Sequence, residues 1–174
     1  MSSPPIFGLV LTGGRSSRMS RDKASLAYRG RSQLERTMDL LTPFCSERFV
    51  SVRADQRNDP LRARYAQIVD REPGLGPLAG ILAAQAEVPT VAWLVVACDL
   101  PRLDADTLAQ LIKQRDTRHL ATAFRSSSDG LPEPLCALYE PASAPVIATY
   151  AASGGRCPRK FLLNNDVALF DLAH

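Results

Sequence analysis

The sequence predicts a three-layer α/β/α sandwich with a Rossmann-like, mainly parallel sheet and an antiparallel addition near its end. Three observations predict this fold. Short apolar runs alternate with stretches of helical periodicity along the chain, which is typical of parallel α/β domains. Residues 91–97 are apolar throughout, as expected for a central strand that helices cover on both faces. Two strand candidates joined by a short polar turn in the last third favour the antiparallel addition.

The first strand and the first helix are predicted by an apolar run and a capping pattern. Residues 6–11 are a short apolar run of the kind found in buried strands. Ser32 and Glu35 have the spacing of a capping box, in which the two side chains satisfy the first amides of a helix. Apolar residues then share one helical face until Pro43 stops the pattern: Leu34, Met38 and Leu41.

The middle of the chain continues the alternation. Residues 48–52 and 67–70 are strand candidates, and a short helix is expected between them, within residues 59–65. A loop rich in glycine and proline then leads to Pro77. Proline suits the first helical position, so a helix is predicted from Pro77 to about residue 87.

The second half supplies the remaining elements. After the apolar run, Asp104 has the character of an N-cap for a helix that carries Leu108, Leu111 and Ile112. The remaining segments are predicted as strands at 121–124, 135–139 and 167–170, and as helices at 141–152 and 158–163.

Length and composition suit one globular domain that spans residues 1–174. The chain has 174 residues, of which 45% are hydrophobic and 22% charged, an ordinary composition for a domain with a full core. Its net charge of +3 is too small for a general polyanion binder, so we expect no nucleic-acid partner. A small phosphorylated ligand fits this charge better.

The pattern of apolar residues and cysteines favours a cytoplasmic protein. The first residues lack a basic region followed by an apolar stretch, and no run reaches the roughly 18 apolar residues of a membrane span. We therefore expect no membrane partner. The cysteines are scattered and form no metal-binding pattern, which indicates free thiols in a reducing compartment: Cys45, Cys98, Cys136 and Cys157.

The loop after the first strand has the composition of a nucleotide-phosphate site. Gly13 and Gly14 lack a Cβ, so backbone N–H groups there can approach a ligand oxygen closely. Hydroxyl and cationic side chains that can bind phosphate surround them: Thr12, Ser16, Ser17, Arg15, Arg18, Arg21 and Lys23. Ligands of open α/β sheets bind at the carboxyl ends of strands, where this loop begins. A solvated basic loop is the alternative interpretation.

Two familiar glycine motifs do not match this loop. It lacks the Gly-Lys-Ser/Thr ending of a Walker loop, and its spacing is not G-x-G-x-x-G, so neither a P-loop ATPase nor a dinucleotide dehydrogenase is indicated.

A candidate metal ligand follows the apolar run 91–97. Asp99 there is well placed to bind a metal at the carboxyl end of a buried strand, although an aspartate can also cap a turn.

Four stretches in order resemble the nucleotidyltransferase superfamily, and most closely its molybdenum cofactor guanylyltransferase family. They are residues 11–23, 76–81, 98–101 and 134–139, which together span most of the chain. The resemblance implies an enzyme that transfers GMP from GTP to the terminal phosphate of molybdenum-carrying molybdopterin and releases pyrophosphate. It implies Mg²⁺ as the cofactor, and it suggests molybdoenzymes or other cofactor-biosynthesis proteins as further partners.

The resemblance also implies roles for individual residues. It places the nucleotide against Leu11, Thr12, Gly13 and Gly14, its phosphates at Lys23, the nucleotide region at Asp70 and the magnesium at Asp99. Relatives that use CTP commonly have Ala at the position of Gly13, so the glycine pair favours guanine. The attacking phosphate oxygen is already anionic, so no catalytic base is expected. Lys23 and Arg18 would balance the charge that develops as pyrophosphate leaves.

Three positions depart from the family pattern. Ser20 replaces a glycine after Arg18-Met19, and Arg53 stands where an asparagine that contacts the nucleotide is usual. Near the end, Asn164-Asn165-Asp166 replaces the usual Asn-x-Asn-Thr-Pro, a change expected on the pterin side.

Two other functions share the main features. A cytidylyl- or sugar-phosphate nucleotidyltransferase would have the same opening loop and Asp99, and a non-catalytic cofactor-binding module could keep the fold without the reaction.

The second half of the chain contains a set of cations with two interpretations. They bind the pterin phosphate or a partner protein, or they form a solvated basic surface: Arg102, Arg156, Arg159 and Lys160.

Overall fold

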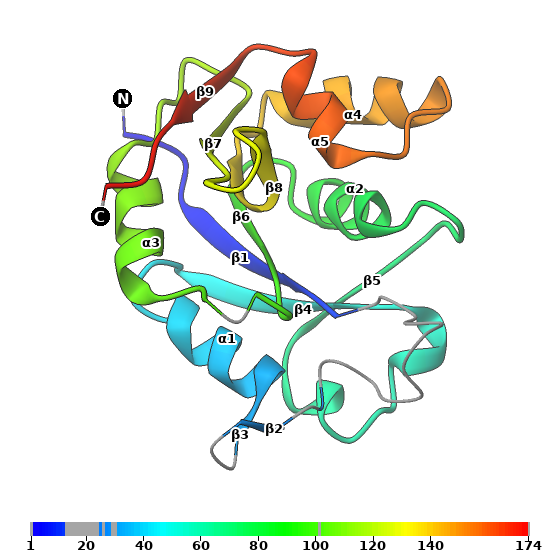
Figure 1. Cartoon of the computed structure of the whole chain (residues 1–174). Helices are drawn as coiled ribbons and strands as arrows, with labels where there is room; N and C mark the ends of the chain where they lie inside the picture. The colour runs from blue at the N-terminus through cyan, green and yellow to red at the C-terminus, as the bar shows by residue number, and fades with distance from the viewer. Residues whose placement is uncertain (1, 13–24, 26, 29–30, 101, 174) are drawn as a thin grey trace.

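Helices flank both faces of a seven-stranded sheet in the computed structural model, which describes residues 2–12, 25, 27–28, 31–100 and 102–173 (Figure 1). Its strands are β1 (Ile6–Leu11), β4 (Glu47–Val52), β5 (Gln67–Val69), β6 (Ala92–Ala97), β7 (Ala121–Arg125), β8 (Pro132–Tyr139) and β9 (Val167–Phe170). The α-helices are α1 (Gln33–Leu41), α2 (Pro77–Glu87), α3 (Ala105–Lys113), α4 (Ser143–Ala152) and α5 (Pro158–Leu163).

The sheet is mainly parallel, with one strand reversed. Its order is β5-β4-β1-β6-β8-β7-β9, and β5, β4, β1 and β6 run parallel to one another. β8 is antiparallel to both β6 and β7, and β9 pairs in parallel with β7. The prediction of a parallel sheet with an antiparallel addition is therefore confirmed.

The core lies in two layers, one on each face of the sheet. Successive residues of β1 point to opposite faces, so Leu9 and Val10 are both fully buried but belong to different clusters. Leu9 packs in the cluster that contains α2, α4 and α5, whereas Val10 packs in the cluster that contains α1 and α3. Figure 1 shows the same division, with α1 and α3 on one side of the sheet and the other three helices on the opposite side.

The predicted helix starts are confirmed by their hydrogen bonds. The Ser32 Oγ accepts the backbone N–H of Glu35 at 3.1 Å, and the Asp104 Oδ1 accepts that of Thr107 at 2.9 Å. The apolar stripe of α1 is buried as predicted, since no member is more than 1% exposed: Leu34, Met38 and Leu41.

Several boundaries differ from the sequence predictions. The short helix expected within residues 59–65 is a 3-10 helix, η3 (Arg62–Arg64), and a second one, η2 (Ala54–Gln56), precedes it. The strand expected at 67–70 ends at Val69, and the helix expected from residue 141 begins at Ser143. A small additional sheet pairs β2 (Ala27–Tyr28) with β3 (Arg31–Ser32).

β8 begins three residues earlier than predicted, at Pro132. Proline normally weakens a strand because it has no N–H to donate. Here β6 pairs with β8 only from Val96–Cys136 onward, so Pro132 and Pro134 lie beyond that pairing and cost it no hydrogen bond.

In the part of the chain that the structure describes, no helix is long and apolar enough to cross a membrane.

Candidate active site

The carboxyl ends of four parallel strands lie side by side along one end of the sheet, which we call the carboxyl edge. Leu11 at the end of β1 pairs with Ser51 of β4 on one side and with Ala97 of β6 on the other. Beyond Ser51, β4 pairs with β5 through Val52 and Val69. The residues that follow these strands therefore share that edge: Thr12 after β1, Arg53 after β4, Asp70 after β5, and Cys98 and Asp99 after β6.

Hydrogen bonds connect three of these strand ends. The Thr12 hydroxyl donates to the backbone carbonyl of Ser51 at 2.8 Å, and the Ser51 hydroxyl donates to Oδ1 of Asp70 at 3.1 Å. The backbone N–H of Asp70 donates to the carbonyl of Val52 at 2.8 Å, which continues the β4–β5 pairing past the end of the strand. Thr12 and Asp70 are therefore held in a fixed relation across β4.

Asp70 is a half-buried carboxylate. Burial raises its pKa above the usual value, and this effect outweighs the hydrogen bond from Ser51 and the positive charge of Arg53, which both lower the pKa. Keeping an ionised carboxylate in this place costs stability, and a cost of this kind is typical of functional sites.

Asp99 differs from Asp70 in its surroundings. Cys98 before it is buried, and its N–H donates to the Leu11 carbonyl at 3.2 Å, so β1 and β6 stay together past their last paired residues. Asp99 itself is exposed at the same edge. An exposed carboxylate can hold a hard cation whose other ligands are water and phosphate oxygens. Among the described residues, no three His, Cys, Asp or Glu side chains gather into a metal site.

The first turn of α2 packs directly against the strand ends. A Cβ added to Gly80 would lie 2.5 Å from the Ser51 Oγ and 2.8 Å from the Leu11 Cδ2. Only glycine permits this approach. The loop before α2 ends at Gly76, whose φ of +57° is a conformation that glycine adopts readily, and Pro77 then occupies the first helical turn as predicted.

One buried cation at this edge was missed in the sequence analysis. Arg62 in η3 is only 1% exposed, and its guanidinium bonds to Thr12 and to Asp59. Arginine in a polar stretch is typical of a surface residue, so neither composition nor periodicity could have identified it.

The departure at Asn164-Asn165-Asp166 does not lie at this edge. The Asp166 carbonyl accepts the N–H of Leu120, just before β7 begins, and Asp166 also contacts His119 at 2.7 Å. β7 runs parallel to β6 because both are antiparallel to β8, so the start of β7 lies toward the amino end of β6. These three residues therefore lie toward the opposite end of the sheet, and their expected effect on the pterin-side contacts stays a prediction.

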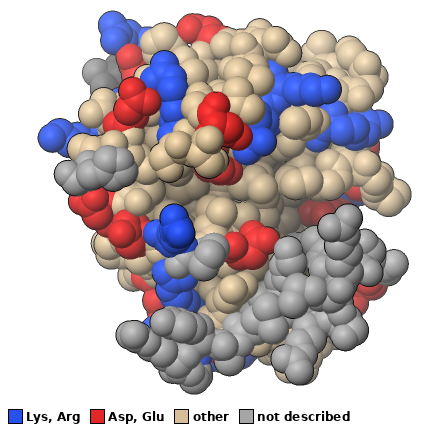
Figure 2. Space-filling model, viewed as in Figure 1, with Lys and Arg blue, Asp and Glu red and all other residues tan. Residues whose placement is uncertain are grey.

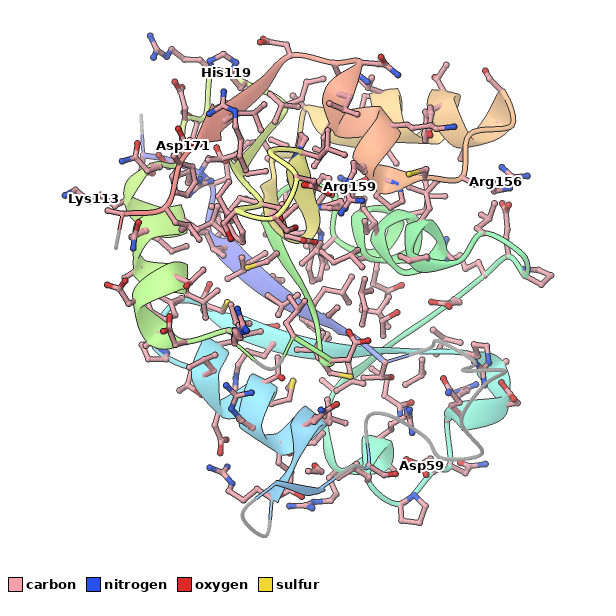
Figure 3. All side chains as sticks on the ribbon, in the orientation of Figure 1. Asp59, Lys113, His119, Arg156, Arg159 and Asp171 are labelled. Atoms are coloured by element: carbon pink, nitrogen blue, oxygen red, sulfur yellow. The ribbon has the colours of Figure 1, made fainter. Side chains whose placement is uncertain are left out.

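The expected basic set is divided by the fold. The Arg159 Nε donates to the carbonyl of Pro132 at 3.1 Å, and the start of β8 lies at the carboxyl edge because β8 runs antiparallel to β6. Figure 3 shows Arg159 beside β8 and Arg156 at the outer margin of the view, where it bonds to the end of α4. Figure 2 shows Lys and Arg side chains over the region where Figure 1 places α4 and α5. A hydrogen bond therefore places Arg159 at the start of β8, whereas Arg156 bonds to the end of α4.

The sequence matches the family described as MobA-like NTP transferase domain over residues 8–168. The chain belongs to this family. A molybdenum cofactor biosynthesis bifunctional protein from Synechocystis sp. is 36% identical over the whole chain, which spans 52% of that relative. A molybdenum cofactor guanylyltransferase from Xanthomonas euvesicatoria is 39% identical over 69% of the chain and 59% of the relative.

Solved structures agree with this membership. The crystal structure of molybdopterin-guanine dinucleotide biosynthesis protein A from Archaeoglobus fulgidus superposes with a TM-score of 0.77 at 25% identity, over 95% of this chain and 83% of that one. The MobA-like domain spans about half to two thirds of the length of its first three curated relatives, at 52%, 66% and 59%.

The MobA-like domain brings together only part of the expected site in the described residues. Leu11, Thr12, Asp70 and Asp99 lie along one sheet edge. The other expected site residues lie outside the described residues: Gly13, Gly14, Arg18 and Lys23, together with Ser20. Arg53 stands at the same edge, where its Nε donates to Asp55 at 3.1 Å.

Proposed function

We propose that this MobA-like domain transfers GMP from GTP to the terminal phosphate of molybdenum-carrying molybdopterin and releases pyrophosphate. Family membership and the names of its relatives support this reaction. The observation that carries the assignment is the joined row of strand ends. The Thr12–Ser51–Asp70 hydrogen bonds and Asp99 share the edge where β1 ends, and residues 13–23, the glycine loop, follow β1 and Thr12 in the sequence.

The reaction needs orientation and charge neutralisation more than a protein nucleophile. A terminal phosphate oxygen of the acceptor attacks the α-phosphorus of GTP, a new P–O bond forms, and the bond to the β-phosphate oxygen breaks, so that pyrophosphate leaves with its electron pair. We assign Leu11, Thr12, Gly13 and Gly14 to the nucleotide, and Asp70 to the nucleotide region. Lys23 and Arg18 balance the charge on the leaving pyrophosphate.

Asp99 is the residue that would hold a divalent cation. Nucleotidyltransferases typically use such a cation, and we propose Mg²⁺ here because an exposed carboxylate beside phosphate oxygens suits a hard ion that keeps several waters. When bound, the ion would neutralise phosphate charge. We propose Asp70, which directly follows β5, as a second contributor.

The acceptor phosphate has a candidate partner in Arg159. Its side chain reaches the start of β8 at the carboxyl edge, and a guanidinium matches the geometry of a phosphate.

We further propose that residues 1–174 form a single domain and that the protein is cytoplasmic. We also propose that it contacts molybdoenzymes or other cofactor-biosynthesis proteins.

Replacing Asp99 tests the proposed cation site. Asp99→Asn keeps the size of the side chain but removes its charge, and Asp99→Ala removes the carboxylate altogether. We expect each change to lower GTP turnover by at least about a hundredfold at saturating magnesium, because the charge on the phosphates is then poorly balanced. Pyrophosphate release measures this loss, and Asp106→Asn on the exposed surface of α3 is the matched control. Turnover of Asp99→Ala close to that of the wild type would remove Asp99 from the mechanism.

Nucleotide binding separates the proposal from its two rivals. Titration with GTP, CTP and UTP, each with and without magnesium, should give magnesium-dependent binding that is selective for GTP. A preference for CTP or UTP would favour a cytidylyl- or sugar-phosphate nucleotidyltransferase. Selective GTP binding without pyrophosphate release in the presence of molybdopterin would favour a non-catalytic cofactor-binding module.

A further inference from the structure

Arg62 is a cation in the interior of the domain. It lies in η3, between β4 and β5, and only 1% of the residue is exposed. Burying a guanidinium is costly unless hydrogen bonds and a counter-charge replace the lost water. The contacts that satisfy Arg62 therefore indicate what the burial achieves.

All three guanidinium nitrogens of Arg62 donate hydrogen bonds, and two of them go to Thr12. Nε donates to the Thr12 Oγ1 at 3.0 Å, and one terminal nitrogen donates to the Thr12 carbonyl at 3.1 Å. The other terminal nitrogen pairs with the Asp59 Oδ2 at 3.1 Å. Asp59, labelled in Figure 3, comes from the turn just before η3 and is about one-third exposed, with 33% of its side chain accessible.

The contacts of Thr12 complete this arrangement. Its hydroxyl hydrogen is donated to the Ser51 carbonyl at 2.8 Å, and Arg62 supplies a donor to the same oxygen. The Thr12 carbonyl is held as well, so both the side chain and the backbone of this residue have fixed directions. A planar guanidinium holds two acceptors in one geometry, which a lysine ammonium on a flexible stem does not.

Stability alone is a poor explanation for these contacts. Buried ion pairs commonly contribute little net stability compared with apolar side chains of similar size. The next arginine of the same helix, Arg64, shows the ordinary arrangement, since its side chain is 59% exposed and lies 3.6 Å from Glu35. Within η3, one arginine is therefore directed to the strand end and the other to the surface.

We propose that Arg62 is a positioning residue that fixes Thr12, the last described residue before the glycine loop, in the geometry that binds the nucleoside triphosphate. This rests on the proposed assignment of that loop to the nucleotide. Arg62 does not touch the substrate in this account. It raises the fraction of the free protein in which Thr12 is already in the binding geometry, so it lowers the apparent dissociation constant for nucleotide.

Kinetics of Arg62 variants test this proposal. Arg62→Met keeps an unbranched apolar side chain without the donors, and Arg62→Lys keeps the charge without the fork. Both should raise the KM for GTP, by about tenfold for Met and less for Lys, while kcat stays within about twofold. Arg64→Met, in the same helix, is the matched control and should leave KM and kcat unchanged. All assays are run well below the melting temperature of the weakest variant.

A purely structural role would give a different result. It would lower the melting temperature and the active fraction, so the apparent kcat would fall while KM stayed constant, and that outcome overturns the proposal. If Arg62→Met does not fold, Asp59→Asn supplies the same test, because it loosens the guanidinium without removing it. An unchanged KM in that variant would also overturn the proposal.

A double-mutant cycle links the effect to Thr12. Thr12→Val removes the hydroxyl that Arg62 holds, and combining it with Arg62→Met should raise KM by much less than the product of the two single effects. Independent effects would contradict the proposed coupling. If the wild type prefers another nucleotide, the guanylyl assignment fails, and the same measurements with that nucleotide still decide the role of Arg62.

Discussion

At the scale of a single residue, Asp70 shows how the burial of a carboxylate at the carboxyl edge differs from that of a carboxylate on the surface. Its carboxylate accepts the Ser51 hydroxyl at 3.1 Å, yet burial raises its pKa above the usual value. The folded protein therefore binds a proton at Asp70 more readily than the unfolded chain does. Stability is lost as the pH rises through the folded pKa and is regained as the pH falls through it.

Asp70→Asn should therefore make the domain more stable at neutral pH. The amide keeps an oxygen that can accept from Ser51, but it has no charge to desolvate, so we expect the melting temperature to rise by a few degrees. The gain should shrink as the pH falls through the folded pKa, because wild-type Asp70 then becomes neutral too. Thermal melts across this range, with Asp106→Asn as an exposed control, measure the difference. A gain that grows toward acid pH would contradict the account.

Single residues also mark what the sequence could and could not predict. Asp99 was identified because it follows an apolar run, and Asp70 only through the family resemblance; the structure places both at the carboxyl edge. Their roles stay predictions. Arg62 was not identified, because burial of an arginine depends on acceptors that are distant in the sequence: Thr12 is 50 residues away from Arg62. The residues next to Arg62 in the sequence do not indicate such a distant partner.

At the scale of elements, the close contact of α2 with β1 and β4 determines how the strand ends fit together. Ser51 bonds through its carbonyl to Thr12 and through its hydroxyl to Asp70, and Gly80 of α2 packs directly on it. The start of α2 was predictable from Pro77. The tight contact at Gly80 was not, because it depends on how two distant segments pack.

Gly80→Ala should weaken the domain even though alanine is the better helix former. The new Cβ would lie 2.5 Å from the Ser51 Oγ, so Ser51 must shift, and we expect a net cost of about 1–3 kcal/mol in the free energy of unfolding. Urea unfolding measures this cost. Ala86→Gly on the exposed side of α2 gives the propensity effect alone, about 1 kcal/mol. A Gly80→Ala variant that is more stable by that amount would show that the contact is not tight.

The length and the sequence signal of each element decided whether it could be predicted. Elements with a strong sequence signal were predicted close to their observed bounds, such as β6 from its unbroken apolar run and α1 from its helical periodicity. The pairing of β2 with β3 was missed because each strand has only 2 residues, too few to show a period. η3 was expected as a short helix, but its three residues form a 3-10 turn, which sequence pattern does not distinguish.

At the scale of the whole molecule, the sheet places its parallel strand ends on one edge and reverses direction at β8. The reversal brings the start of β8, and with it Arg159, to the same edge as Asp99, so residues from both halves of the chain lie where we propose that nucleotide and acceptor bind. The two core layers hold this edge in place from both faces of the sheet.

The central claim is guanylyl transfer to a pterin phosphate, and one assay tests it most directly. Pyrophosphate release is measured with molybdenum-carrying molybdopterin as the acceptor, magnesium in excess, and GTP, CTP or UTP as the donor. We predict release from GTP with a kcat/KM at least about tenfold above the value for either pyrimidine nucleotide. Faster release from CTP or UTP, or no release from GTP, would contradict the account.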